Sequence, residues 1–155
     1  MAIWKIEQLS ARPKLNNPVL IEGLPGIANV GKIAVDFIIG KLKSQKLYRF
    51  SSHRFPHSVF VNEKNIVQLP VIEMHFLKQK RQDLLFLVGD LQPIDEESCY
   101  EFCELVLDKL KELGGKELIT LGGIGLSEIP KKPKLYCTAT DNAIMKRYKD
   151  GTNME

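Results

Sequence analysis

Short apolar runs that end at glycine mark two buried strands in this chain. The segment Pro18–Glu22 carries the run Val19–Ile21 and stops at Gly23, and Asp83–Asp90 has five successive apolar residues before Gly89. Continuous apolar runs of this length are typical of strands covered on both faces, as in parallel sheets. We therefore predict that both segments are buried strands.

Two longer segments have the spacing of amphipathic helices. Apolar residues recur every three or four positions in Ile27–Leu42 and in Glu96–Leu113. The Gly114-Gly115 pair is expected to end the second helix. Asp141 is placed to cap a last helix that runs through Tyr148.

The remaining strands are less regular. Three segments in the middle of the chain contain β-branched and aromatic residues interrupted by Pro56, Asn62 and Pro70, which predicts short strands or hairpins whose order stays open. These segments are Leu47–Ser52, Ser58–Val61 and Asn65–Leu77. Two further short strands are predicted at Glu117–Leu121 and Lys134–Thr138.

Strands that alternate with helices indicate an α/β fold. Such a pattern is typical of a mainly parallel sheet with right-handed crossovers and helices on its faces. A chain of 155 residues is long enough for one domain with a sizeable core, so a single domain over residues 1–155 is expected.

Composition and charge limit the cellular location and the partners that we expect for this chain. Hydrophobic residues make up 44% of the chain, and no apolar run approaches the ~20 residues of a membrane helix or forms a signal-peptide core. The net charge of +3, with its densest cluster at Lys131, Lys132 and Lys134, argues against a nucleic-acid binder. Three cysteines fit a reducing compartment. We expect a cytoplasmic protein that binds neither membranes nor nucleic acid.

The loops that follow the predicted strands form a candidate ligand cleft. Carboxyl ends of parallel strands share one sheet edge, which is where open α/β sheets bind ligands. Small residues after strands are also what tight turns require, so this alternative stays open. The candidate cleft residues are Glu22, Gly23, Gly26, Gly31, Lys32, Asp90, Gly122, Gly123, Gly125 and Asp141.

The segment Gly26–Lys32 has the glycine and lysine spacing of a phosphate-binding P-loop but departs from it at the next position. Ile33 stands where a hydroxyl should hold magnesium, and Glu22 and Pro25 disfavour phosphate at the strand exit. The alternative is structural: the glycines make the turn and let the helix pack closely on the sheet.

No catalytic or metal constellation is apparent. Pro56 separates His53 from His57, which makes a shared helical face unexpected. Cys99 and Cys103 lie on the apolar face of their helix, where buried small hydrophobes are expected. We therefore predict no catalytic residue, no metal and no cofactor.

The first predicted helix is apolar on almost every side. Ile33, Val35 and Ile39 add to its main stripe, and a single sheet face cannot cover all of them. Either another subunit or partner covers the excess, or the helix is enclosed within its own domain.

Three blocks of the sequence resemble one family. LIEGLPGIANVGKIAVDFII, DLLFLVGDLQP and ELGGKELITLGGIGLSEIPKKPKLYCTAT occur in the order seen in archaeal and bacterial proteins related to proteasome assembly chaperone 2. The resemblance implies an α/β sandwich similar to nucleoside phosphorylases. It also implies a non-catalytic platform that binds proteasome α subunits and forms homo- or hetero-oligomers.

The chain departs from this family at its end. Family members usually continue well beyond Asn142, so the family's C-terminal part is expected to be absent. The ending Thr152–Glu155 lacks the hydrophobic residue and tyrosine with which several assembly chaperones dock. A proteasome contact is thus expected on the body of the domain. The alternative function is binding or turnover of a nucleoside, nucleotide or phosphate at the glycine loops.

Overall fold

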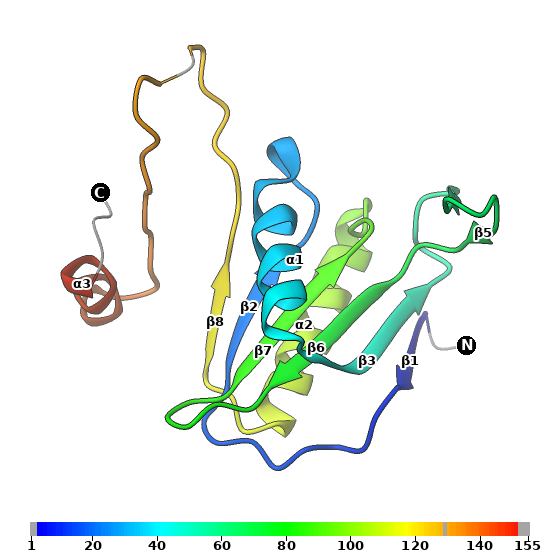
Figure 1. Cartoon of the computed structure of the whole chain (residues 1–155), viewed down its shortest axis with the longest axis horizontal. Helices are drawn as coiled ribbons and strands as arrows, with labels where there is room; N and C mark the ends of the chain where they lie inside the picture. The colour runs from blue at the N-terminus through cyan, green and yellow to red at the C-terminus, as the bar shows by residue number, and fades with distance from the viewer. Residues whose placement is uncertain (1–2, 129, 152–155) are drawn as a thin grey trace. The chain divides into compact units, whose positions relative to one another are not determined.

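The computed structural model describes residues 3–128 and 130–151 and divides into two units, Met1–Ile124 and Gly125–Glu155. The ending Thr152–Glu155 lies outside the described residues, and the expectation of one domain stays a prediction. The first unit is built on a six-stranded sheet in the order β1-β3-β6-β7-β2-β8 (Figure 1). Its strands are β1 (Trp4–Gln8), β2 (Val19–Gly23), β3 (Gln45–Ser52), β6 (Ile72–Leu77), β7 (Leu84–Gly89) and β8 (Glu117–Thr120).

One half of this sheet is parallel, as predicted. β2 runs parallel to β7, with Val19 opposite Leu84, and parallel to β8, with Leu20 opposite Leu118. The connection from β7 to β8 is long enough for a crossover because it contains the helix α2 (Glu96–Glu112).

The prediction of a mainly parallel sheet is wrong, because the other half is antiparallel. β1 pairs with β3, β3 with β6 and β6 with β7 in antiparallel registers. The loop from β6 to β7 spans only residues 78–83, which is too short for a parallel crossover. β1 was not predicted. The fold is mixed α/β.

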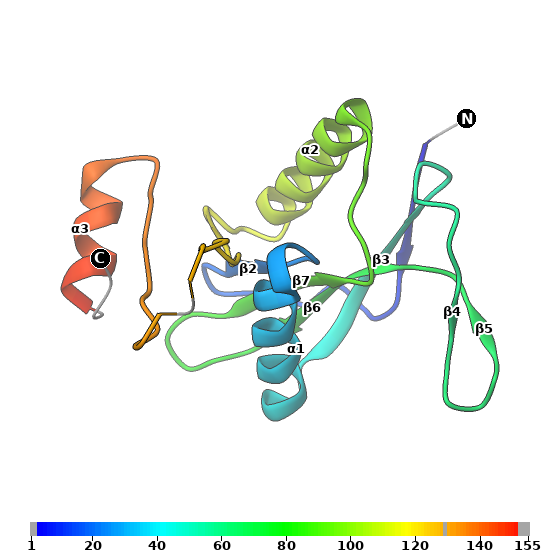
Figure 2. The same ribbon diagram turned by 90° about the horizontal axis from the view of Figure 1, so that it is seen from above.

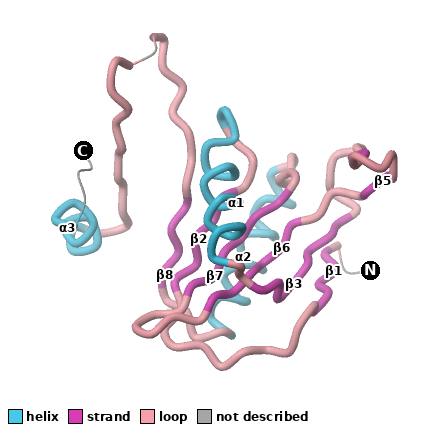
Figure 3. The backbone as a smooth tube through the Cα atoms, viewed as in Figure 1, coloured by secondary structure: helices cyan, strands magenta, loops and turns pink. Residues whose placement is uncertain are grey.

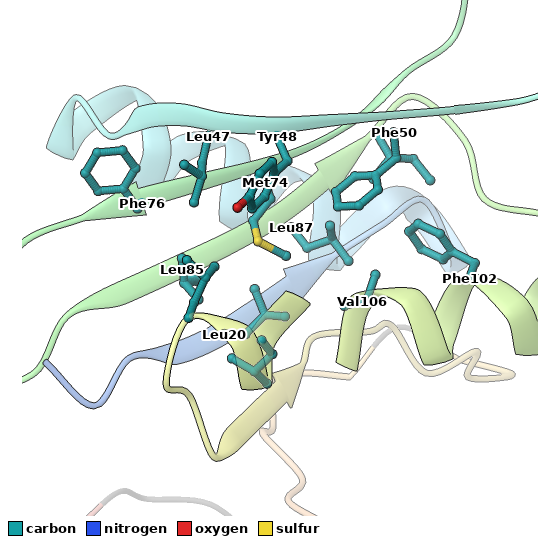
Figure 4. Close-up of a cluster of buried hydrophobic side chains, with 13 residues drawn as sticks. Leu20, Leu47, Tyr48, Phe50, Met74, Phe76, Leu85, Leu87, Phe102 and Val106 are labelled. Carbon is teal, nitrogen blue, oxygen red and sulfur yellow. The ribbon is translucent and has the colours of Figure 1, made fainter. Parts of the chain in front are cut away.

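The larger core lies between the sheet and α2. Leu20, Phe50, Met74 and Leu87 point from the strands toward Phe102 of α2 (Figure 4). The ring centroids of Phe50 and Phe102 are 6.0 Å apart in an edge-to-face arrangement, which aromatic pairs favour. This core fixes the positions of the central strands.

A smaller core lies on the opposite face, beneath the helix α1 (Val30–Leu42). Val35 of α1 is fully buried against Phe86 and Val88 of β7. A short 3₁₀ turn, η1 (Ile27–Asn29), leads into this helix, so the helix predicted over Ile27–Leu42 is confirmed. Figure 2 shows α1 and α2 on opposite sides of the sheet.

The predicted boundaries of α2 are confirmed to within one residue, and both ends are capped. The Asp95 carboxylate accepts a hydrogen bond from the Ser98 N–H at 3.0 Å. At the other end Gly114 has a φ of +83°, and the Gly115 N–H donates to the Leu110 carbonyl at 2.9 Å. This six-to-one bond is a Schellman motif.

Replacing Asp95 with alanine is expected to lower the melting temperature by a few degrees, because an N–H at the helix start loses its acceptor. Thermal unfolding followed by circular dichroism measures the shift. Glu104→Ala, at an exposed position within the same helix, is the control and should leave the midpoint unchanged. Equal midpoints for both variants would contradict the capping role.

A separate hairpin projects from the sheet. Its strands are β4 (Phe60–Val61) and β5 (Val67–Gln68), which pair in antiparallel fashion. Figure 2 shows the hairpin beside β3, on the same side of the sheet as α1. The predictions of short strands in the middle of the chain are therefore confirmed, with β6 inside the predicted segment Asn65–Leu77.

The second unit contains the helix α3 (Asn142–Gly151). The Asp141 carboxylate accepts hydrogen bonds from the N–H groups of Ala143 and Ile144 at 2.8 and 2.9 Å, which confirms the predicted cap. The strand predicted at Lys134–Thr138 is wrong: this segment is irregular, and among the described residues no strand pairs with it (Figure 3). Without a pairing partner, residues that favour strands do not form one. None of the described helices is long and apolar enough to cross a bilayer.

Candidate functional site

The four candidate loops lie at residues 22–26, 89–92, 122–125 and 138–141, and the first three of these loops follow neighbouring parallel strands. β7, β2 and β8 end at the same edge of the sheet, as predicted. The Gln92 side chain, beyond β7, donates a hydrogen bond to the Pro25 carbonyl, beyond β2. The fourth loop, Thr138–Asp141, follows no strand and belongs to the second unit.

These loops pack against each other through their glycines. A Cβ atom on Gly31 would lie 2.0 Å from the Leu121 carbonyl oxygen, and one on Gly23 would lie 2.5 Å from the Gly31 carbonyl oxygen. A Cβ on Gly123 would lie 2.5 Å from the Ile27 carbonyl oxygen. Close backbone approach therefore accounts for these three glycines, which supports the structural alternative.

The charged residues of the P-loop-like segment have local partners. Lys32 Nζ lies 2.9 Å from Asp36 Oδ2, one turn further along α1. Glu22 Oε1 accepts a hydrogen bond from the Leu24 N–H at 2.7 Å, and burial raises the pKa of Glu22. A partly buried carboxyl group next to the helix start disfavours phosphate there. A ligand at these loops stays a prediction.

The remaining candidates do not share one location. Gly26 and Gly122 have open space where a Cβ atom would lie, and so does Gly125, which begins the second unit with Asp141. Asp90 joins the start of β6 to the end of β7: its Oδ2 accepts from the Val71 N–H at 3.1 Å. Of the candidates, Asp90 also borders a groove that the sequence did not predict.

This feature, the hairpin groove, lies between the β4–β5 hairpin and the β3–β6 part of the sheet and encloses about 1100 Å³. Its wall is largely apolar and its floor is charged. The wall includes Phe55, Val59, Phe60, Leu69 and Pro70, the floor includes Lys46, Arg49, Ser51 and Glu73, and His53 and His57 also line it.

Glu73 is the centre of the charged floor. Its side chain is only 11% exposed and accepts bonds from Lys46 Nζ at 2.7 Å and from Arg49 Nη2 at 2.9 Å. His75 Nε2 lies 3.5 Å from the same carboxylate, and Ser44 Oγ lies 3.2 Å from His75 Nδ1. A nearly buried charge of this kind is stable only when it is paired and hydrogen-bonded.

The pKa of Glu73 is lowered to about 2 by these partners. The hydrogen bond with His75 contributes most, burial acts in the opposite direction, and the bonds with Lys46 and Arg49 lower the pKa further. The carboxylate is therefore ionised at neutral pH, and its two cationic partners balance it. This network lies on the β3–β6 part of the sheet, on the same face on which α1 packs against β7.

Sequence reasoning missed this network, although a signal was present. In Ile72–Leu77 the polar residues Glu73 and His75 alternate with the apolar residues Ile72, Met74 and Phe76. Alternation with period two places the polar pair on the face opposite the α2 core. The alternation is hard to recognise because it occupies only the end of the longer, irregular segment Asn65–Leu77.

Two apolar surfaces are exposed in the first unit. The hairpin face consists of Val59, Val61, Val67 and Leu69, which are 54 to 74% exposed. The α1 stripe consists of Ile27, Val30, Ile33 and Phe37, which are 48 to 64% exposed. Of the residues in the apolar excess of this helix, Val35 is fully buried and Ile39 is half-buried, whereas Ile33 is exposed, so the first unit covers only part of that excess.

The cysteines and histidines form no metal centre in the described ranges, where no group of three or more His, Cys, Asp or Glu side chains could hold an ion. Cys103 is exposed and Cys99 half-buried, so the prediction that both are buried is wrong for Cys103. Although the residue is exposed, partial desolvation of its thiol group raises the pKa of Cys103, and the nearby Cys99 and Glu22 raise it further. A raised pKa favours the unreactive thiol form.

Comparison with known proteins identifies the family. The family model described as PAC2 family matches residues 20–155. The chain belongs to the PAC2 family. This agrees with the resemblance to proteasome assembly chaperone 2 proteins seen in three blocks of the sequence.

Solved structures of two archaeal proteins share the fold. Pyrococcus furiosus PbaB, an archaeal proteasome activator, is 32% identical with a TM-score of 0.88 over 97% of this chain and 63% of that chain. Pyrococcus furiosus PbaA, an archaeal homolog of proteasome-assembly chaperone, is 19% identical with a TM-score of 0.64 over 86% of this chain and 54% of that chain.

This chain also covers only part of the length of a curated relative. An uncharacterized protein of Methanocaldococcus jannaschii, MJ1210, is 26% identical over 136 residues, which are 88% of this chain and 52% of the relative. The chain therefore spans between half and two thirds of the length of these relatives.

Proposed function

We propose that this PAC2-family chain is a non-catalytic binding protein that binds the α subunits of the proteasome. The observation that carries the proposal is the likeness to PbaB, an archaeal proteasome activator, over nearly the whole chain. The candidate loops are compatible with this role, because three of their glycines serve close packing and Lys32 pairs within its own helix.

The hairpin face is the surface we assign to the α subunit. Its four apolar side chains are more than half exposed, and a two-stranded hairpin is only marginally stable without packing. A partner that covered Val61 and Val67, which lie opposite each other in the ladder, would stabilise the hairpin and remove apolar surface from water. The adjacent hairpin groove offers polar contacts at the edge of the same surface.

Native mass spectrometry with α subunits of the cognate proteasome tests the proposal. We expect a complex at micromolar concentration, and we expect Val61→Glu with Val67→Glu to weaken it by at least about tenfold. Tyr100→Glu is the control, because Tyr100 is 67% exposed on α2, away from the hairpin. Circular dichroism of each variant verifies the fold.

The absence of any complex with the unmodified chain would contradict the proposed function. A complex that the hairpin substitutions leave unchanged would instead place the contact on another surface. The cytoplasmic location and the homo-oligomeric state belong to the same proposal, and sedimentation of the purified chain measures the oligomeric state directly.

A further inference from the structure

The β4–β5 hairpin has two faces, and only one of them lines the hairpin groove. In its ladder Phe60 lies opposite Gln68, and the next pair is Val61 with Val67, so the two pairs point to opposite faces. Phe60 and Gln68 line the groove. Val61 and Val67 belong to the hairpin face, so the α subunit and a ligand of the groove would contact different sides of the hairpin.

The apolar wall of the groove is not filled by the first unit itself. Phe60 is 43% exposed and Leu69 is 74% exposed, although both line the groove. Phe55, Pro56 and Pro70 extend the same wall. Apolar and aromatic side chains that line a concave surface are typical of a site that receives an apolar group.

The floor carries cations at one end, and they keep donors beyond those that hold Glu73. Arg49 donates from Nε and Nη2 to Glu73 Oε1, while its Nη1 lies 3.6 Å from Glu7 Oε2. Lys46 Nζ lies 2.7 Å from Glu73 Oε2, and its side chain is 53% exposed. Because Glu73 is only 11% exposed, the charge that this end presents to a ligand is positive.

An acidic residue lies at the other end of the floor. Asp90 lines the groove, and its Oδ2 accepts from the Val71 N–H, which leaves Oδ1 for a ligand. Lys46 is level with His75 in the β3–β6 register, and four residues separate Val71 from His75. This corresponds to about 13 Å at the rise of a strand, which is the span of five residues of extended peptide.

We propose that the hairpin groove binds an extended peptide segment of a partner protein, with an acidic side chain at one end, a basic side chain at the other and an apolar side chain between them. The acidic side chain would pair with Lys46 and Arg49, the basic one with Asp90, and the apolar one would cover Phe60. This charge pattern is complementary to the groove and fixes the register of the segment.

The size of the groove also favours a peptide. Its volume of about 1100 Å³ lies above the range of about 300 to 1000 Å³ that is usual for small-molecule pockets. The inference goes beyond the proposed function and does not rest on it, because a peptide in the groove needs no α subunit on the hairpin face.

Fluorescence anisotropy with labelled peptides tests the inference. The probes are Lys-Val-Phe-Val-Ser-Glu with blocked ends and the peptide of reversed sequence, because either chain direction can bring the charges to their partners. We expect at least one of them to bind with a dissociation constant below about 100 μM. Glutamine in place of the peptide's glutamate should weaken binding by about fivefold, as loss of a partly exposed ion pair does.

Variants of the chain locate the site. Phe60→Ser should weaken binding by at least about tenfold, whereas Val61→Ser, on the other face of the same hairpin, should not change it. Lys46→Gln should weaken binding by about fivefold, and Lys43→Gln, at an exposed position outside the groove, is its control. Circular dichroism of each variant verifies the fold.

Two results would overturn the inference. One is that neither peptide binds at concentrations up to about 1 mM. The other is a dissociation constant that Phe60→Ser or Lys46→Gln leaves unchanged. The complex with α subunits is measured separately, through Val61 and Val67, so its failure would contradict the proposed function and not the peptide site.

Discussion

Replacing Gly31 with alanine is expected to destabilise the fold by about 2 to 3 kcal/mol. The added Cβ would lie 2.0 Å from the carbonyl oxygen and 2.8 Å from the carbonyl carbon of Leu121. Both are backbone atoms that cannot rotate away, so α1 and the end of β8 would have to separate. Urea unfolding followed by circular dichroism measures the change.

Gly40→Ala is the matched control in the same helix. Its new methyl group meets open space, and alanine is favoured over glycine within helices by up to about 1 kcal/mol. We therefore expect Gly40→Ala to be neutral or stabilising. Equal free energies of unfolding for the two variants would show that Gly31 is not needed for close packing.

Replacing Glu73 with glutamine is expected to lower the free energy of unfolding by about 1 to 2 kcal/mol at pH 7. This value is smaller than the pKa shift alone would give, because the partners of Glu73 are partly exposed to solvent. The folded pKa of Glu73 is lowered from 4.5 to about 2. A lowered folded pKa stabilises the fold above the unfolded pKa, and this contribution is lost as the pH falls through the folded value. The difference in free energy of unfolding between the unmodified chain and Glu73→Gln should thus be largest above pH 4.5 and disappear toward pH 2.

Urea unfolding at several pH values from neutral down to about pH 3 measures this difference. Glu7→Gln is the control, because Glu7 is 54% exposed and its contact with Arg49 is 3.6 Å long. Exposed pairs of this kind contribute little, so Glu7→Gln should change stability by less than about 0.5 kcal/mol. A Glu73→Gln difference that stays constant with pH would show that ionisation of this carboxyl group does not stabilise the fold.

Local sequence signals predicted the elements whose structure is decided locally. α2 has an acidic cap, an apolar stripe and a glycine pair, and its boundaries follow from them. The parallel pairing of β2 with β7 follows from two apolar runs buried on both faces. β1 was missed because an edge strand depends on its pairing with β3, which lies far along the chain.

The candidate site was predicted only in part, for a similar reason. The loops after β2, β7 and β8 are neighbours because these strands are parallel, and this could be predicted. The close contact between Gly31 and Leu121 agrees with the alternative that the glycines allow the helix to pack closely on the sheet. The Glu73 network joins residues of β3 and β6 and is visible only when the register between these two strands is known. Lys134–Thr138 shows the opposite error, because its strand-like pattern lacks a pairing partner in the described chain.

The helices α1 and α2 are held on the sheet by cores of different size. Thirteen buried residues belong to the cluster that holds α2, whereas three buried residues, Val35, Phe86 and Val88, form the cluster beneath α1. Local opening therefore begins at α1 and leaves the aromatic centre around Phe102 undisturbed. The backbone amides of α1 would lose hydrogen-exchange protection first, and a molecule that lies across this helix would slow their exchange without changing that of α2.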